Sequence, residues 1–334
     1  MIGLNEVARA AGVSPATASR ALHRPELVAL RTRERVEQAA TELGYHPNVL
    51  ARGLRTRGSR TIGLIVTDIL NPFHATIAKG VQDTAEAQGY TVLMFNSDEQ
   101  PGKERRALET LHGHLPMGLI VVPTAQTREN LAIVEGLPTV ELDRASGKEG
   151  AHTVMVDNVA GAREAVTHLT ELGHRRIGMI VGNLDISTAR ERLQGYREAL
   201  EHAGLPYDER LVLPGNHREP DGRLAALRLL SRRLPPTALF VGNNEMTVGA
   251  VLATRELGLE IPRDLSLIGF DDSRWAQTMS PALSVVSQPT YELGQLACQR
   301  LLSLIAGQPL QGSVRLPTRM IYRQSTAPVM TVQA

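Results

Sequence analysis

Six residues near the amino terminus carry side chains that suit contact with nucleic acid. Arg20 can hold O6 and N7 of a guanine with its two-pronged guanidinium group. The hydroxyls of Thr17 and Ser19 suit phosphates or base edges, and the side chain of Ala16 can touch the methyl group of a thymine. The full set is Ser14, Pro15, Ala16, Thr17, Ser19 and Arg20.

The sequence lacks the common motifs of catalytic sites. We find no GxSxG nucleophile elbow, no GxxxxGKS or GxxxxGKT phosphate loop and no GxGxxG after an apolar run. His112 and His114 stand alone on a polar stretch, whereas a zinc site needs three or four converging ligands. The single cysteine, Cys298, lies in an apolar-rich segment typical of an inert core residue. We therefore expect no catalysis, no metal and no cofactor.

Three short helices are predicted to position the residues at 14–20. Apolar residues recur at helical spacing in the segments 4–11, 15–22 and 32–43. Gly12 and Gly44 follow the first and third segments, where a left-handed residue favours a helix end. Ser14 stands at the N-cap position of the second helix, with Pro15 at its first turn. A tight turn between two such helices indicates a helix-turn-helix, whose second helix enters the major groove of DNA.

An alternative is that Ser14 and Thr17 only cap a helix of an ordinary bundle. The distribution of charge favours DNA binding instead. Residues 1–60 carry ten Arg against five Glu, a net charge of +5, whereas residues 61–334 carry 26 basic and 30 acidic side chains, a net charge of −4. A basic end on a mildly acidic protein is typical of contact with phosphates.

A linker is predicted at 47–60. Pro47 begins it and Asn48 could cap a helix, but the following helix-forming run spans barely two turns and is too short to be stable alone in water. We expect it to be disordered away from DNA. A flexible linker is the alternative that Gly53 and Gly58 suggest.

Beyond residue 61 the chain alternates apolar runs with amphipathic stretches. The expected buried strands are 61–66, 90–95, 117–122, 138–142, 176–182, 238–242 and 265–270. The expected helices are 75–88, 103–113, 158–172, 188–203, 222–233 and 245–257. This alternation predicts an α/β fold with two doubly wound parallel sheets, meeting around 157–162. Ligands in such sheets bind beyond the carboxyl ends of the strands, which here predicts a cleft between two subdomains.

Composition and length agree with this organisation. The 334 residues exceed one domain of ordinary size, and 42% hydrophobic against 21% charged residues is typical of a globular protein. No apolar run approaches the roughly 18 residues that span a bilayer, and the first ten residues lack the pattern of a signal peptide. We expect a cytoplasmic protein without membrane contact.

The sequence resembles the lactose-repressor (LacI/GalR) family of bacterial transcription regulators. The resemblance begins with the runs LNEVARAAGVSPATASRAL, TRERV and ELGYHPNVLARGLRTRGSRTIGLIV, and it continues through 61–326. Two residues depart from the family pattern: Ala29 replaces a Ser that caps the third helix, and Ala18 replaces a Val. The family also implies a core like that of the periplasmic sugar-binding proteins.

The resemblance implies the following domains. Residues 1–46 form the helix-turn-helix domain, 47–60 the hinge and 61–334 the effector-binding and dimerisation core. Within the core, the N-subdomain spans about 61–158 and 291–317, and the C-subdomain spans about 159–288 and 318–330.

The resemblance also assigns a role to the hinge. It implies that the hinge forms a helix in the minor groove when two subunits meet on the operator, and that Leu54 wedges between two central base pairs, at a CG step. Such a wedge costs a few kcal/mol of unstacking, offset by the contacts that bent DNA allows. The hinge residues expected at DNA are Asn48, Ala51, Arg52, Leu54 and Arg55, with Arg57 as a further phosphate anchor.

Effector residues follow from four local motifs that match the family. DILNPFH, STARERLQGY, VGNNEMTVGA and GFDDSRW supply Phe73, His74, Thr188, Arg192, Asn243, Asp271 and Trp275. His74 departs from the usual Phe, and Asn244 stands where Asp is frequent. Their donors, acceptors and rings suit a sugar, or a purine nearly as well. Two alternatives remain open: Arg192 could pair with Asp271 across the cleft, and Asn243 could cap the next helix.

We therefore expect a homodimeric transcription repressor that is not an enzyme. A small polar effector, sugar-like or alternatively a purine, would control its affinity for double-stranded DNA at a pseudo-palindromic operator. Two other functions are disfavoured. One is a ligand receptor without DNA binding, against which the missing signal-peptide pattern and residues 1–60 speak. The other is a sugar-modifying enzyme with an added regulatory domain, for which we find no motif.

Overall fold

The computed structural model describes residues 2–23, 25–45, 60–310 and 312–329. The chain divides into two compact units, Met1–Ser59 and Arg60–Ala334. The hinge residues Asn48, Ala51, Arg52, Leu54 and Arg55, with Arg57, lie outside the described residues.

The first unit is a small helical domain. Its elements are α1 (Leu4–Ala10), α2 (Pro15–His23), the 3₁₀ turn η1 (Pro25–Leu27) and α3 (Leu30–Glu42). Its core consists of Val7, Ala8, Ala11, Ala18, Ala21, Val36, Ala39 and Ala40. Gly12 and Gly44 adopt φ of +63° and +62° behind α1 and α3, which confirms both predicted helix ends. Ala29 precedes α3 without a side-chain cap, so this helix begins without the hydrogen bond that a Ser would supply.

The second unit contains two lobes, each built on a six-stranded sheet. The sheet of the first lobe has the order β11-β5-β4-β3-β1-β2, and all its neighbouring strands are parallel. The strands are β1 (Thr61–Val66), β2 (Thr91–Asn96), β3 (Gly118–Val121), β4 (Thr139–Leu142), β5 (His152–Val156) and β11 (Ser313–Leu316).

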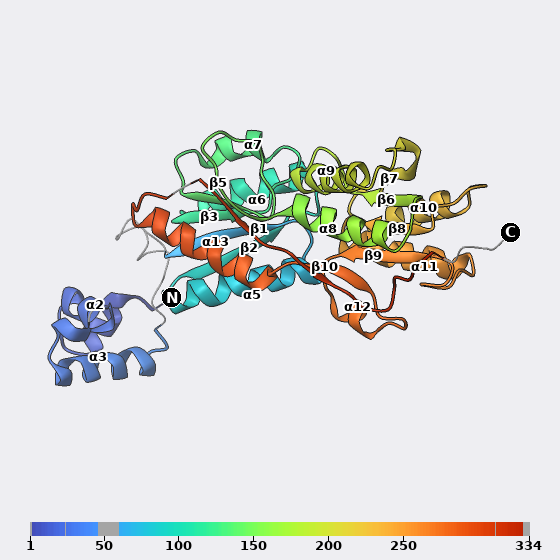
Figure 1. The fold of residues 1–334 in the computed structure, drawn as a ribbon. Helices are drawn as coiled ribbons and strands as arrows, with labels where there is room; N and C mark the ends of the chain where they lie inside the picture. Colours follow the sequence, from blue (N-terminus) through green and yellow to red (C-terminus); the bar gives the residue numbers. More distant parts are fainter. Residues whose placement is uncertain (1, 24, 46–59, 311, 330–334) are drawn as a thin grey trace. The chain divides into compact units, whose positions relative to one another are not determined.

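Helices cover both faces of the first sheet (Figure 1). One face packs against α5 (Pro72–Ala87) and α13 (Thr290–Ile305). The other packs against α6 (Pro101–Gly113), near α7 (Thr127–Asn130), and against η2 (Leu131–Val134). Helices α5 and α13 approach closely because each carries a glycine at the contact. A Cβ on Gly80 of α5 would meet the carbonyl of Tyr291, and a Cβ on Gly294 of α13 would meet the carbonyl of Ile77.

The second lobe repeats this plan. Its strand order is β12-β10-β9-β8-β6-β7, and β12 runs antiparallel to β10 where an all-parallel sheet was predicted. The strands are β6 (Ile177–Val181), β7 (Val212–Pro214), β8 (Ala238–Val241), β9 (Ser266–Phe270), β10 (Ser284–Ser287) and β12 (Arg319–Ile321). The helices are α8 (Asn158–Glu171) and α9 (Ser187–His202) on one face, and α10 (Glu219–Leu230) and α11 (Asn244–Glu256) on the other. The short η3 (Glu209–Leu211) and α12 (Arg274–Thr278) complete it.

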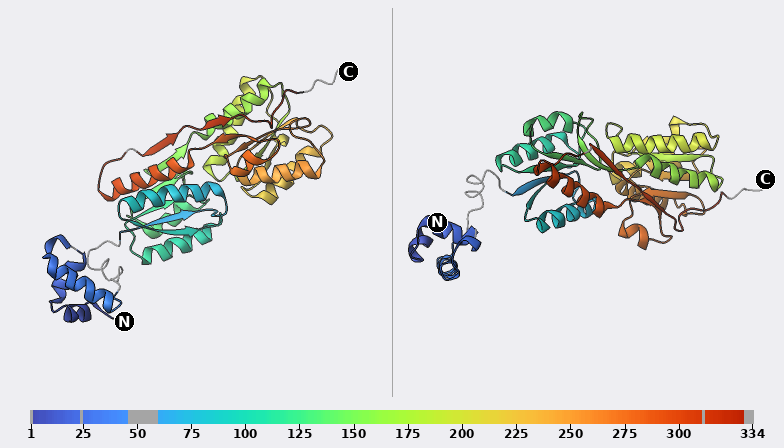
Figure 2. Two further views of the ribbon diagram at one scale, coloured as in Figure 1. Left: turned by 90° about the horizontal axis from the view of Figure 1, so that it is seen from below. Right: turned by 60° about the vertical axis from the view of Figure 1, so that its left-hand side comes forward.

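Within residues 60–310 and 312–329, the chain crosses between the lobes three times: from β5 to α8, from β10 to α13 and from β11 to β12. The two lobes therefore lie side by side, as the two views in Figure 2 show. Each lobe is doubly wound, which confirms the predicted fold class. In this topology the carboxyl ends of the strands face the place where a ligand binds.

Candidate functional site

The start of α2 is built around the side chain of Ser14. Its Oγ accepts a hydrogen bond from the backbone N–H of Thr17 at 3.1 Å and lies 2.9 Å from the Thr17 hydroxyl. The predicted N-cap is therefore present, and both hydroxyls are partly occupied by it. The guanidinium of Arg35 on α3 donates to the carbonyls of Ala11 and Gly12, so it ties the turn between α1 and α2 to the third helix.

One side of α2 faces its own domain core and the other faces outward. Ala18 and Ala21 are buried, with 0% and 1% of their surface exposed. Pro15, Ala16 and Arg20 are exposed, and Thr17 and Ser19 are half-buried. The six residues predicted to contact DNA thus lie at or near the outward side of α2, with Ser14 exposed beside them. A helix presented in this way can enter a major groove.

The second unit carries a polar cavity between its lobes. Its lining comes from loops and helix starts that follow strands of both sheets. The lining residues are Asp68, Asn71, Phe73, His74, Glu99, Asp143, Arg144, Thr188, Arg192, His217, Asn243, Asp271 and Gln288. The carboxyl ends of the strands therefore converge on one site, as expected for two doubly wound sheets.

A buried ion pair dominates the first lobe's side of the cavity. Nη1 and Nη2 of Arg144 each donate to a carboxylate oxygen of Glu99 at 2.7 Å, and Nη1 also donates to the Pro123 carbonyl at 3.2 Å. Burial alone would raise the pKa of Glu99, but the attraction of Arg144 outweighs it and lowers that pKa to about 2. Glu99 is therefore ionised at any ordinary pH.

Two buried aspartates interact with the arginines of the cavity. Burial raises the pKa of Asp143 to about 6, against the opposing attraction of Arg144, whose Nε lies 3.4 Å from it. Burial also raises the pKa of Asp271, against the attraction of Arg192. Oδ1 of Asp271 accepts from the side-chain amide of Gln288 at 2.5 Å. These carboxylates are held in a setting that resists their ionisation.

Arg192 makes its contacts within the second lobe and at the first crossing. Its Nε donates to Oδ1 of Asn158 at 2.8 Å, and its Nη1 donates to the Gly242 carbonyl at 2.5 Å. The guanidinium carbon also lies 3.7 Å from the centre of the Phe270 ring. Asp271 attracts Arg192 through space, and the hydrogen bonds that orient Arg192 come from Asn158 and Gly242.

Two buried histidines face the same cavity. Nε2 of His74 lies 2.9 Å from the hydroxyl of Thr67, and its ring meets Phe73 edge-on at 5.1 Å. Burial, with Arg144 nearby, lowers the pKa of both His74 and His217 to about 3. Both rings are therefore neutral at physiological pH.

The cavity brings together six of the seven residues that the family motifs predicted for an effector: Phe73, His74, Thr188, Arg192, Asn243 and Asp271. Asn243 also caps α11, since its Oδ1 accepts from the Met246 N–H at 2.9 Å. Trp275 is not among the lining residues. Its indole donates to Asn244 at 2.8 Å and packs against the core between the second sheet and helices α10 and α11.

Sequence reasoning missed seven lining residues: Asp68, Asn71, Glu99, Asp143, Arg144, His217 and Gln288. Each follows a strand, and this signal could have found the first five behind the predicted strands 61–66, 90–95 and 138–142. Backbone geometry also marks the site, because Glu99, Asp143, His217 and Asp271 all adopt positive φ, between +58° and +82°. Such backbone strain in residues other than glycine is found preferentially at functional sites.

Three contacts join the two lobes near the cavity. The Ala145 N–H donates to Oγ of Ser187 at 2.9 Å. Arg218 of the second lobe donates to the Asp98 carbonyl at 2.8 Å and lies 3.6 Å from the carboxylate of Asp68. About 20 Å³ remains free inside, enough for one or two water molecules. A metabolite is larger than this free space, so its binding requires a more open arrangement of the lobes.

Other site chemistries find no support in the described ranges. No group of three or more His, Cys, Asp or Glu side chains there could hold a metal ion. Cys298 is fully buried and burial raises its thiol pKa to about 12, while His112 and His114 are exposed. Every described helix is too short or too polar to cross a membrane.

Comparison with known proteins gives matches along nearly the whole chain. Residues 3–48 match the family "Bacterial regulatory proteins, lacI family", and residues 166–326 match the "Periplasmic binding protein-like domain". The HTH-type transcriptional repressor CytR of Escherichia coli (strain K12) is 36% identical over 329 residues, covering 97% of this chain and 96% of the relative.

Two solved structures are similar along the same length. The lac repressor dimer bound to operator and the anti-inducer ONPF has a TM-score of 0.87 at 29% identity, covering 98% of this chain and 99% of that one. The transcriptional regulator CelR in complex with cellobiose has a TM-score of 0.75 at 32% identity, covering 97% of this chain and 100% of that one.

Proposed function

Because the chain belongs to the lacI family of bacterial regulatory proteins, we propose that it is a homodimeric repressor that binds a pseudo-palindromic operator. We propose that a sugar-like effector, bound in the cleft between the lobes, controls its affinity for this operator. The protein is a DNA-binding transcription regulator with an effector site in its core, and its family is not enzymatic. The homodimer, the symmetry of the operator and the class of effector are the proposed parts. We further propose that it acts in the cytoplasm.

One observation supports the proposal: the same chain contains a helix, α2, with exposed polar and basic residues, and a cavity lined by residues of both lobes. We propose that Ser14, Pro15, Ala16, Thr17, Ser19 and Arg20 contact the operator. The hinge residues Asn48, Ala51, Arg52, Leu54 and Arg55 would join them, with Leu54 as the wedge.

Effector control follows from the way in which the lobes close. Binding of a metabolite must part contacts such as those of Ser187 and Arg218, so the bound and free lobes differ in arrangement. A ligand shifts an equilibrium only through its different affinity for the two states. In a dimer, a change between the lobes alters the spacing of the two hinge segments and hence their ability to fold on DNA.

The polar residues of the cavity support a sugar as effector, and a purine is the alternative. Arg192, Asn243 and Asp271 supply donors and acceptors, and Phe73 supplies an aromatic ring within the lining. The complex of the similar regulator CelR with cellobiose favours the sugar.

Selection of duplexes from a random pool by the full-length protein tests the proposal. We expect an enriched pseudo-palindrome that is bound by two chains, measured by fluorescence anisotropy and analytical ultracentrifugation. At least one sugar or purine that raises the melting temperature of the protein should change operator affinity by tenfold or more. Absence of sequence preference at physiological salt, with or without ligands, contradicts the proposal and favours a receptor without DNA function.

A further inference from the structure

The cavity lacks hydrogen-bond donors for several of its buried acceptors. Oδ1 of Asp143 and Oε1 of Gln288 have no hydrogen-bond partner among the described residues, although the two residues are only 4% and 8% exposed. The side-chain NH₂ group of Gln288 faces Asp271 and donates to it, which leaves Oε1 as the unpartnered atom. Nδ1 of His74, which is 3% exposed, is also unpartnered and donates or accepts according to the tautomer of the ring, and the donor Nε of Arg144 lacks a hydrogen-bond partner too within the described part of the chain. A ligand that fills the cavity must therefore donate to Asp143 and Gln288 and accept from Arg144, and hydroxyl groups can do both.

The charge of the cavity is also unfavourable to an anion. Among the described residues its lining holds four carboxylates, Asp68, Glu99, Asp143 and Asp271, and two guanidiniums, Arg144 and Arg192. Arg218 adds a third guanidinium beside Asp68. With both histidines neutral, the four carboxylates, when all are ionised, outnumber the three guanidiniums by one, and burial raises the pKa of two of them, Asp143 and Asp271.

Both terminal nitrogens of Arg144, and Nε and Nη1 of Arg192, already donate hydrogen bonds. Arg144 is held in a two-pronged pair with Glu99 and by a carbonyl. Arg192 donates to Asn158 and to the Gly242 carbonyl, and its guanidinium lies over a ring. A two-pronged contact from a phosphate group to the terminal nitrogens of Arg144 would have to break the pair with Glu99, and the described lining residues include no lysine.

We propose that the cleft selects an uncharged ligand rich in hydroxyl groups and rejects its phosphorylated counterpart, with Asp143 as the residue that sets this selectivity. A free sugar and a nucleoside share this chemistry. The proposal rests on the proposed effector site and narrows the class of effector that it takes. Hydroxyl groups donate to Asp143 and Gln288, whereas a phosphate monoester at neutral pH offers mainly acceptors and brings negative charge beside four carboxyl groups.

Matched ligand pairs test this selectivity on the full-length protein. The probes are ribose, glucose, cytidine and adenosine, each beside its own monophosphate, with affinities measured by isothermal titration calorimetry. We expect at least one uncharged member to bind and its monophosphate to bind at least tenfold more weakly. Equal or tighter binding of a monophosphate overturns the proposal, and so does failure of every uncharged probe to bind at 10 mM.

A variant then tests the role of Asp143. Asp143→Asn removes the charge with little change of shape, and we expect it to weaken the uncharged ligand and to reduce the discrimination against its monophosphate about tenfold. Glu109→Gln is the matched control, because Glu109 is an exposed carboxylate on α6 that pairs with Arg105. Undiminished discrimination in folded Asp143→Asn protein overturns the role of Asp143. Should this variant fail to fold, the wild-type pairs still decide the selectivity.

Failure of this inference differs from failure of the proposed function. A monophosphate that binds tightly and changes operator affinity overturns the selectivity and leaves effector-controlled repression standing. An uncharged ligand that binds selectively without changing operator affinity supports the selectivity and contradicts the proposed control of DNA binding.

Discussion

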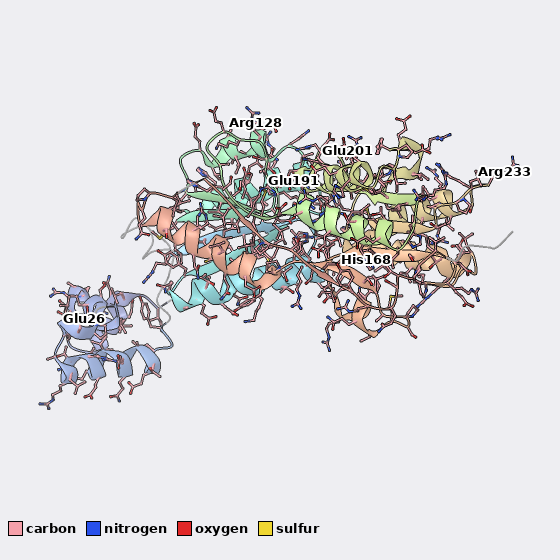
Figure 3. The ribbon with its side chains drawn as sticks, viewed as in Figure 1. Glu26, Arg128, His168, Glu191, Glu201 and Arg233 are labelled. Atoms are coloured by element: carbon pink, nitrogen blue, oxygen red, sulfur yellow. The ribbon has the colours of Figure 1, made fainter. Side chains whose placement is uncertain are left out.

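Glu191 on α9 accepts two hydrogen bonds from the guanidinium of Arg315 on β11, at 3.0 and 2.6 Å, and so joins the second lobe to the first. The same carboxylate accepts from the side-chain amide of Asn158, at the crossing between β5 and α8, at 3.0 Å. Figure 3 shows Glu191 near the junction of the lobes. The carboxylate of Glu191 therefore contacts two of the three chain segments that connect the lobes, the β5–α8 crossing and the strand β11 that precedes the last crossing.

Arg315→Met removes this tie between the lobes. Because the Arg315 side chain is 42% exposed, solvent screens the pair, and we expect the free energy of unfolding in urea to fall by no more than about 1 kcal/mol. We expect the dissociation constant of a bound effector to change several-fold, since closure of the lobes is altered. Arg163→Met is the control, because Arg163 pairs with Glu198 within the second lobe. Equal effects of both variants on the effector would contradict a role in closure.

Glu99→Gln breaks the buried pair with Arg144. Arg144 is then left as a buried charge without its partner, and we expect the free energy of unfolding to fall by about 3–5 kcal/mol. The double variant Glu99→Leu with Arg144→Met removes both charges and should recover part of this loss. Urea denaturation followed by circular dichroism measures both. A loss below about 1 kcal/mol in Glu99→Gln would show that solvent reaches the pair.

His74→Phe reduces the sensitivity of the protein to acid. Burial lowers the pKa of His74 to about 3 in the folded state, whereas an unfolded histidine takes up a proton below about 6.5. Between these values the unfolded state binds one more proton, so the stability of the wild type falls as the pH falls. From pH 7 to pH 5 we expect the wild type to lose about 2 kcal/mol more than His74→Phe. His217 and Asp143 titrate in both proteins, so their contributions largely cancel in the difference between the two. Stability that falls equally with pH in both proteins would refute the assignment of this acid sensitivity to His74.

Binding of an uncharged effector weakens in acid. Burial raises the pKa of Asp143 to about 6, opposed by the facing Arg144 and Arg192 and reinforced by Asp271 and Glu99. A ligand that donates to the ionised carboxylate loses this acceptor once Asp143 is protonated, so affinity should fall about fivefold between pH 6 and pH 5. The two histidines stay neutral in this window. Calorimetry at several pH values measures the slope, and Asp143→Asn should abolish it.

Arg20→Ala tests the reading of bases by α2. If the exposed Arg20 holds a guanine, its loss should weaken binding to the selected operator by about 1–3 kcal/mol and relax preference at one base pair. Binding to unrelated duplex DNA should change much less. Arg105→Ala removes an exposed arginine of α6 as a control. Uniform weakening on all sequences would instead assign Arg20 to a phosphate.

The first unit followed from local signals. Gly12 and Gly44 end helices, Ser14 caps α2 and the apolar faces meet in one core, as predicted. These features depend on neighbours within a few residues, so the sequence alone contains them. The turn η1 was missed, and α3 begins at Leu30, two residues before the predicted start.

In the second unit, the predicted strands are present and are almost wholly buried apart from β2. Gly89, Gly173 and Gly204 adopt positive φ at the predicted helix ends. The strands that prediction missed are β5, β7, β10, β11 and β12. Several of these are short, and β7 and β11 lie at sheet edges with partly exposed residues, where an apolar pattern is weak. The antiparallel β12 depends on a late crossing that no local pattern reveals.

The sequence by itself determined the helix-turn-helix, the alternation of strands and helices, and, through local motifs, six residues of the cavity. Only the tertiary structure decided that Glu99 pairs with Arg144, that Asp143 and His217 join them, and that Trp275 packs in a core. The physical reason is distance along the chain. Arg144 lies 45 residues from Glu99, and only the convergence of strand ends from two sheets removes water from both and makes their charges interact strongly.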